Sequence, residues 1–149
     1  MQFRRSFIGL TLMTLLACEQ TPPEFLTYHN SYLGLVTGKS TLAEVEAKLG
    51  KIKSTETTVD GKNYRFEQVT VNFSGEDPTK IGTIAITSDK NYKSLAGVSL
   101  GEGVESLESK IPHVQAKRRY HIDRKEGVVY WTDGEKVVVI VLAGSLVKR

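Results

Sequence analysis

The chain has 149 residues, a length that favours a single domain. Its 20 Lys and Arg residues against 17 Asp and Glu residues give a formal net charge of +3 and a pI of about 8.9. This near balance does not favour nucleic-acid binding, and a single cysteine excludes an intramolecular disulfide.

The first segment has the order of an export signal. Arg4 and Arg5 form a positive start, and residues 7–16 form an apolar run. That run is too short to span a bilayer, which takes about 20 apolar residues. We therefore interpret residues 1–17 as a signal peptide. Without Arg4 and Arg5 the chain keeps 18 basic and 17 acidic residues, a net charge of +1.

Residues 15–18, Leu-Leu-Ala-Cys, resemble the lipobox of bacterial lipoproteins. The resemblance implies cleavage before Cys18, a diacylglyceryl group on its sulfur and an acylated amine. One acyl chain binds a membrane only marginally, at about 0.8 kcal/mol per buried methylene, whereas two or three anchor it. Glu19 after the cysteine resembles lipoproteins sorted to the outer membrane, facing the periplasm. The alternative is an ordinary secreted protein with one cysteine.

Residues 18–31 are expected to form an extended tether, because Pro22 and Pro23 stand among polar residues. About twelve stretched residues reach roughly 40 Å. The folded part is then residues 32–149, a single domain.

This domain contains a weak internal repeat, at about 34–87 and 97–142. Residues 34–38 align with 97–101, and residues 38–50 align with 101–112 after one deletion. Both copies then have apolar residues at positions i, i+3 and i+7, which predicts two short helices. Matching residues are Leu42, Val45 and Leu49 in one copy and Val104, Leu107 and Ile111 in the other. Gly50 and Pro112 end the helices, and Thr41 with Glu44 is typical of a capping box.

Strand-like sequence follows each predicted helix. The first copy has it at 53–59, 63–66, 69–73 and 83–87, and Asp60-Gly61 is the signal of a type I′ hairpin. The second copy has it at 114–123, 128–132 and 136–142, and the last run is apolar enough to predict a central strand covered on both faces. We therefore predict an α+β fold. Two helix-plus-antiparallel-hairpin repeats form one sheet, with the helices on one face.

Gly38, Lys39 and Ser40 are similar to the end of a phosphate-binding P-loop. That loop needs four residues between its first glycine and Gly-Lys-Ser/Thr, and here only three separate Gly34 from Gly38. An envelope location would also lack ATP. We interpret the segment as a helix entry and expect no nucleotide and no cofactor.

His29, His113 and His121 are scattered without the spacing of metal ligands, so no metal site is predicted. His121 and Asp123 are the only close pair of a histidine and an acid, and on one strand they would share a face. We interpret them as polar residues on an edge or solvent face. No serine has a nucleophile-elbow setting, so no catalytic residue is predicted. A small hydrolase-type envelope enzyme that uses this pair is the alternative.

The densest basic stretch is residues 117–121. Within one strand, Lys117, Arg119 and His121 would share a face that suits an acidic protein surface or anionic lipid. The alternative is a charged strand that only prevents edge-to-edge pairing. On a neighbouring strand, one of Tyr130 and Trp131 should face the core and the other should be exposed as a contact anchor. The alternation does not say which.

Residues 38–50, Gly-Lys-Ser-Thr-Leu-Ala-Glu-Val-Glu-Ala-Lys-Leu-Gly, resemble the helix motif of the SmpA/OmlA (BamE-type) lipoproteins and the repeats of the β-lactamase inhibitory protein. The resemblance implies helices packed on an antiparallel sheet, and the inhibitor binds its target on a concave sheet. The second copy departs from the motif at Gly103 and Pro112, and the inhibitor's disulfides are missing.

We therefore expect a lipid-anchored, non-catalytic envelope protein that binds another envelope protein, as an assembly accessory or an inhibitor does. The predicted contact residues are Lys117, Arg119, His121 and Trp131. A structural lipoprotein at the membrane surface is a further alternative.

Overall fold

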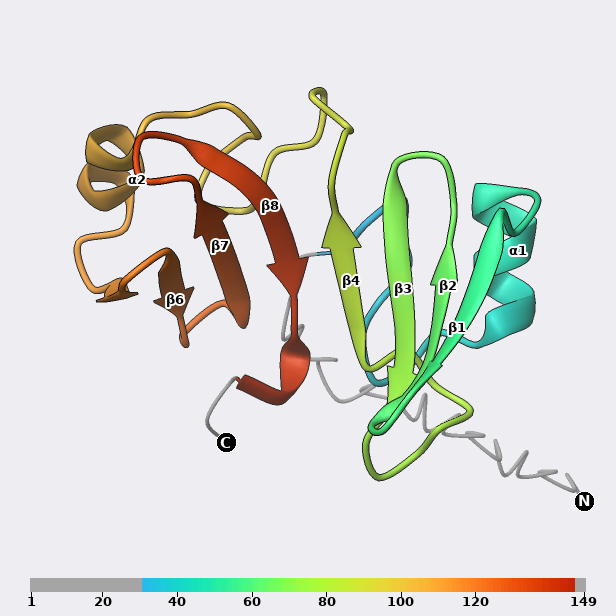
Figure 1. Ribbon diagram of the computed structural model, residues 1–149. Helices are drawn as coiled ribbons and strands as arrows, with labels where there is room; N and C mark the ends of the chain where they lie inside the picture. The colour runs from blue at the N-terminus through green and yellow to red at the C-terminus, as the bar shows by residue number, and fades with distance from the viewer. Residues whose placement is uncertain (1–30, 147–149) are drawn as a thin grey trace, which may run out of the picture.

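Two short helices and one antiparallel sheet of eight strands make up residues 31–146, the part that the computed structural model describes (Figure 1). The predicted signal peptide, Cys18 and nearly all of the predicted tether lie outside these residues. The elements are α1 (Leu42–Leu49), β1 (Ser54–Thr58), β2 (Gly61–Arg65), β3 (Val69–Ser74), β4 (Thr83–Ile86), α2 (Val104–Lys110), β5 (Gln115–Lys117), β6 (Tyr120–Asp123), β7 (Val128–Thr132), β8 (Val137–Leu142) and the 3₁₀ turn η1 (Gly144–Leu146). The α+β prediction is confirmed.

The strands lie in the order β1-β2-β3-β4-β8-β7-β6-β5, so β8, the last of the described strands, is in the middle of the sheet. The central position predicted for residues 136–142 is confirmed. The prediction that both faces of this strand are covered is wrong, because Val138 is exposed and Val139 and Val141 are only half-buried. Neighbouring pairs put Val141 beside Ala85 of β4 and Val129 of β7.

Both helices begin and end as their sequences predict. Thr41 Oγ1 accepts the N–H of Glu44, and the Glu44 carboxylate accepts the Thr41 N–H at 2.7 Å, which completes the capping box of α1. Gly50 follows α1 with a φ of +79°, a value that favours glycine. α2 begins at Gly103 without a side-chain cap and stops before Pro112. The capping difference means that local sequence supports α1 more than α2.

The first hairpin differs from its prediction in the turn. Thr58 pairs with Gly61, so the two-residue loop is Val59-Asp60 and not Asp60-Gly61. Neither loop residue has a positive φ, so the turn is not type I′. Gly61 is needed for another reason, because a Cβ at this position would lie 2.1 Å from the carbonyl oxygen of Phe73 on β3.

Residues 114–123, which were predicted as one strand, form two. β5 and β6 pair antiparallel, with Lys117 opposite Tyr120. Arg118 makes the reversal with a φ of +54°, one of two positive values among the described non-glycine residues. The turn contains no Gly, Pro, Asn or Asp, so the residues that usually announce a turn are missing.

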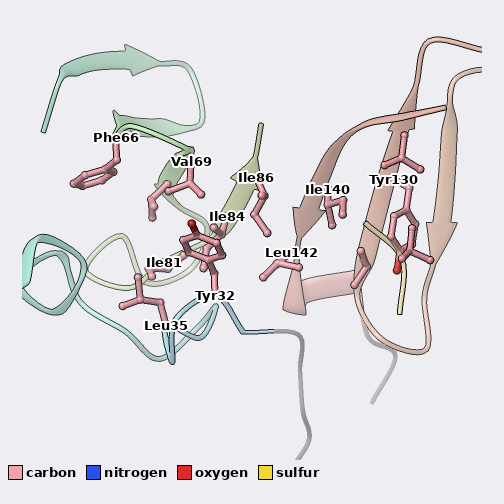
Figure 2. Close-up of a cluster of buried hydrophobic side chains, with 14 of the residues drawn as sticks. Tyr32, Leu35, Phe66, Val69, Ile81, Ile84, Ile86, Tyr130, Ile140 and Leu142 are labelled. Carbon is pink, nitrogen blue, oxygen red and sulfur yellow. The ribbon is translucent and has the colours of Figure 1, made fainter. Parts of the chain in front are cut away.

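One core fills the side of the sheet that the helices contact (Figure 2). Val45 of α1 and Leu107 of α2 are fully buried in it. Across the junction of β4 and β8, Ile84 pairs with Leu142 and Ile86 with Ile140. All these side chains belong to one cluster, so the two halves of the sheet share a continuous hydrophobic interior.

Candidate functional site

The side of the sheet that faces away from the core, called here the open face, has an apolar centre. One row of paired residues crosses four strands and consists of Ala85, Val141, Val129 and Ile122. The next row consists of Val139, Trp131, Tyr120 and Lys117. All eight side chains are half-buried or exposed. Because no described element covers these rows, the centre of the open face is available to a partner.

Tyr120 and Trp131 are the largest exposed side chains on this face. They are 41% and 42% exposed, and their rings meet edge-to-face with centroids 5.0 Å apart. Aromatic side chains of this kind dominate protein contacts, because they bury a large area and lose little conformational freedom. The question left by the sequence is thereby answered, because Trp131 is exposed and Tyr130 is fully buried.

Charge is scarce on the open face. Along the eight described strands, the charged residues on this side are Glu56, Arg65 and Lys117. Lys117, Arg118 and Arg119 form a basic edge next to the aromatic pair. An apolar centre with charge at the rim is the usual layout of a protein-binding surface.

The predicted common face of Lys117, Arg119 and His121 is wrong, because the turn at Arg118 reverses the chain. Lys117 lies on the open face opposite Tyr120. Arg119 is exposed in the turn, where its carbonyl accepts the N–H of Thr132 at 2.8 Å. His121 is buried on the core side, so it cannot form part of an exposed contact surface.

His121 and Asp123 do share a face, but the predicted solvent face is wrong because both are buried under α2 and the loop that follows it. His121 Nε2 lies 3.2 Å from Glu108 Oε1 of α2, and His121 Nδ1 has no partner. Asp123 Oδ1 lies 3.0 Å from His113 Nε2 and also accepts two backbone N–H groups of the next turn. His121 therefore contacts α2, whereas Asp123 contacts the loop that follows α2.

A small pocket of about 240 Å³ lies beside His113 and Asp123. Its other lining residues are Leu95, Ala96, Lys110, Ile111, Lys125 and Glu126. The lining contains acidic and basic side chains but no hydroxyl or thiol nucleophile. Residues 31–146 also contain no group of three His, Cys, Asp or Glu side chains placed to hold a metal ion.

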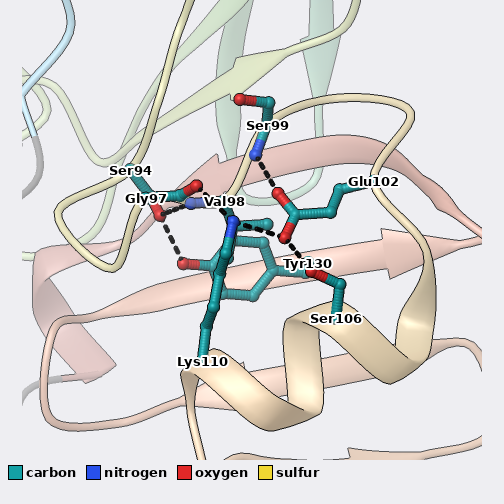
Figure 3. Close-up of polar contacts among 8 residues, drawn as sticks. All are labelled: Ser94, Gly97, Val98, Ser99, Glu102, Ser106, Lys110 and Tyr130. Atoms are coloured by element: carbon teal, nitrogen blue, oxygen red, sulfur yellow. Dashed lines mark hydrogen bonds and ion pairs between the residues drawn. The ribbon is translucent and has the colours of Figure 1, made fainter.

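Behind β7, a polar contact holds the Tyr130 side chain on the core side of the sheet (Figure 3). The Tyr130 hydroxyl donates to Ser94 Oγ at 2.9 Å, and burial raises the pKa of Tyr130 to about 12. Because side chains alternate along a strand, a buried Tyr130 places Trp131 on the open face.

Glu102, next to this contact, ties α2 to the loop before it. Its carboxylate accepts the Ser99 N–H at 3.1 Å and the Ser106 hydroxyl at 2.6 Å, and it pairs with Lys110 at 2.6 Å. Partial burial opposes ionisation, but these contacts outweigh it and hold the pKa of Glu102 below its usual value. The ionised carboxylate therefore supplies at the start of α2 the support that no side-chain cap provides.

Comparison of the chain with protein-family models, curated proteins and solved structures returns no match. Among the helices of residues 31–146, none is long and apolar enough to cross a membrane. Tyr120, Ile122, Val129, Val139 and Val141 of the open face are not among the predicted contact residues. In β7 and β8 apolar residues stand on both faces, which conceals the alternation that would distinguish the two sides. In β6 the alternation points the wrong way, because the polar His121 and Asp123 face the core and the apolar residues face outward.

Proposed function

We propose that this chain is a lipid-anchored, non-catalytic protein of the bacterial envelope that binds another envelope protein through the open face. The observation that carries the proposal is the exposed Tyr120–Trp131 pair on a nearly uncharged sheet surface. Lys117 and Arg119 remain proposed contacts at the rim. An acidic border around an apolar centre is the partner surface that complements this arrangement.

Site-specific photo-crosslinking tests the open face. A photoreactive amino acid at position 131 should give a crosslinked adduct with an envelope protein in cells, whereas the same group at Ala47, an exposed position on α1, should not. The adduct should weaken when Lys117→Glu and Arg119→Glu are added, because reversed rim charges repel an acidic partner. Lys39→Glu with Lys48→Glu is the matched control on the side of α1. Equal adducts at both positions would contradict the proposal.

The anchor is tested separately from the contact face. Radioactive palmitate should label the chain, and Cys18→Ser should remove both the label and the sedimentation of the protein with outer membranes. We propose the periplasmic side of the outer membrane as its location, supported by Glu19. A labelled Cys18→Ser chain would overturn this part of the proposal.

We also propose that residues 34–87 and 97–142 are two copies of one unit. Two backbone contacts at corresponding positions support it. The Gly38 N–H donates to the Ile81 carbonyl at 2.6 Å, and the Gly101 N–H donates to the Val137 carbonyl at 2.7 Å. The strand order supports it as well, because β1–β4 are mirrored by β5–β8 on the other side of the β4–β8 junction.

Kinship with the SmpA/OmlA lipoproteins or the β-lactamase inhibitory protein is part of the same proposal. Its support is the motif at 38–50, which forms α1 with its cap and its closing glycine. An experimental structure from one of these families tests it. An eight-stranded antiparallel sheet with the same strand order and without disulfides would support the kinship.

The second candidate function is contact with the membrane surface, which one observation favours. Two aromatic rings beside Lys117, Arg118 and Arg119 also suit the headgroup region of an anionic bilayer. Chain carrying Cys18→Ser would then bind vesicles rich in anionic lipid, and added salt would weaken the binding. No binding to such vesicles at low salt would exclude this function.

A further inference from the structure

The two outer edges of the sheet are protected to different degrees. β5 has three residues, ends in a basic turn and offers little backbone to a neighbour. β1 has five residues, Ser-Thr-Glu-Thr-Thr, which are exposed except for the half-buried Thr58, with Glu56 as their only charge. Natural sheets usually shield such an edge with lysine, proline or a bulge. Among the described residues, β1 pairs with β2 alone, and from Ser54 to Thr58 it has no lysine, proline or register shift. Lys53 stands directly before it, and the Lys53 N–H still pairs with the Arg65 carbonyl of β2.

A groove of about 740 Å³ lies next to this edge, between the start of α1 and the core side of β1, β2 and β3. Its floor contains Tyr64 and Phe73, whose rings meet edge-to-face with centroids 5.5 Å apart. Leu42 and Ala43 of α1 form one wall. The groove is therefore suited to apolar side chains.

Lys62 is the only charged residue that lines the groove. It is exposed, and within residues 31–146 no acidic side chain forms an ion pair with it. Lys62 pairs across the strands with Thr57 of the edge strand, on the same side of the sheet as Tyr64 and Phe73. A ligand that reaches the apolar floor from the edge of β1 thus passes one unpaired ammonium group.

We propose that β1 accepts an extended segment of another protein as a ninth strand. The strand edge supplies backbone hydrogen bonds, the groove takes an apolar side chain, and Lys62 pairs with a carboxylate of the segment. Alternation along the added strand puts its inward side chains over the groove and leaves the others beside Glu56, where a basic residue fits best. This surface lies at the other end of the sheet from Trp131, and the inference does not depend on the open face.

The edge disfavours a second copy of this chain as the added strand. Two antiparallel β1 strands centred on each other would place Glu56 opposite Glu56, and like charges in that position are destabilising. The proposed segment therefore comes from a different protein, with apolar residues at alternate positions.

Selection of displayed random eight-residue segments on the immobilised full chain tests the proposal. We expect enrichment of segments with alternating apolar residues and a carboxylate. The selected segments are then synthesised with a free or an amidated end, which separates a terminal carboxylate from an acidic side chain as the group at Lys62. No enrichment of alternating segments would overturn the proposal.

Variants locate the binding site of the selected peptides. Ala43→Trp, at an exposed position, fills the groove and should weaken binding at least tenfold. Lys62→Met should weaken peptides with the carboxylate about tenfold and leave peptides without it unchanged. Thr57→Pro should block strand addition, since proline is tolerated at sheet edges but prevents pairing.

Two control variants, Gln115→Pro at the other edge and Trp131→Ala on the open face, should bind the peptides normally. Unchanged binding by folded Ala43→Trp and Lys62→Met would refute the inference.

Discussion

Tyr130 and Trp131 are neighbours in the sequence and lie on opposite sides of the sheet. The Tyr130 hydroxyl is bonded to Ser94, whereas Trp131 lies between Tyr120 of β6 and Val139 of β8 and stays 42% exposed. The burial of Val128, Tyr130 and Thr132 on the core side, with the Tyr130 hydroxyl bonded to Ser94, therefore leaves Trp131 on the open face.

Buried tyrosines make the protein sensitive to alkaline pH. Burial raises the pKa of Tyr130 and of Tyr32 to about 12, and it raises that of Tyr92 as well. Unfolded tyrosines ionise near pH 10, so the unfolded chain binds fewer protons between pH 10 and 12. Stability should be unaffected by these groups below pH 10 and should fall above it. Circular dichroism with tyrosinate absorbance checks this, and a Tyr130→Phe chain should lose stability less steeply.

Glu102 should make the stability depend on acid pH, in the opposite direction to the tyrosines, because its contribution is lost as the pH falls. Its pKa is lowered in the folded state, so its ionised form stabilises the fold above pH 4.5 and less as the pH falls through the folded value. Glu102→Gln should lower the free energy of unfolding by about 1 kcal/mol at pH 7, since Lys110 is partly exposed and solvent screens the pair. Urea titrations at pH 7 and pH 3 check this, because the difference between the two chains should shrink at pH 3.

At the scale of elements, the sequence predicts both helices but only some of the turns. Leu42, Val45 and Leu49 predict α1 through their spacing, and Gly50 closes it. The reversal at Arg118 could not be predicted, because an arginine with positive φ is held there by strand pairing on both sides and not by its own preference. Because of this reversal, His121 lies on the core side of the sheet, opposite to the side of Lys117.

Capping should matter more for α1 than any other local feature. α1 has eight residues, and a helix this short is marginal without its cap and its packing. Thr41→Ala should lower the free energy of unfolding by about 1 kcal/mol. Urea denaturation measures the loss. Ser109→Ala, at an exposed position of α2, is a milder comparison, and an equal loss in both would contradict the assigned role of the cap.

At the scale of the molecule, one core predicts one unfolding transition. Leu142 is fully buried where β4, β8 and β7 meet, so Leu142→Ala should cost about 2–5 kcal/mol. Trp131 fluorescence reports on the second half, and circular dichroism reports on both halves. The two probes should give the same urea midpoint in the parent chain and in Leu142→Ala. Separate midpoints would mean that the two halves unfold independently.

The fold class followed from the sequence, because helices and strands follow one another with clear breaks at Gly50 and Pro112. The open face did not follow, because Val137–Leu142 is apolar at every position and its bulge near Val138 shifts the register. Which valines face outward was decided by the neighbouring strands. The groove was hidden for a similar reason, since its lining comes from α1, from three strands and from the loop that contains Pro78.

The central place of β8 also bears on how the protein is made. In the order of synthesis β8 comes after the other seven described strands, yet β8 is the strand that joins β4 to β7. Until it emerges, the nascent chain holds two unjoined pieces of sheet, each with an apolar edge that attracts other chains. A premature stop before residue 137 would therefore remove the joint between the two pieces and leave neither with a complete interior.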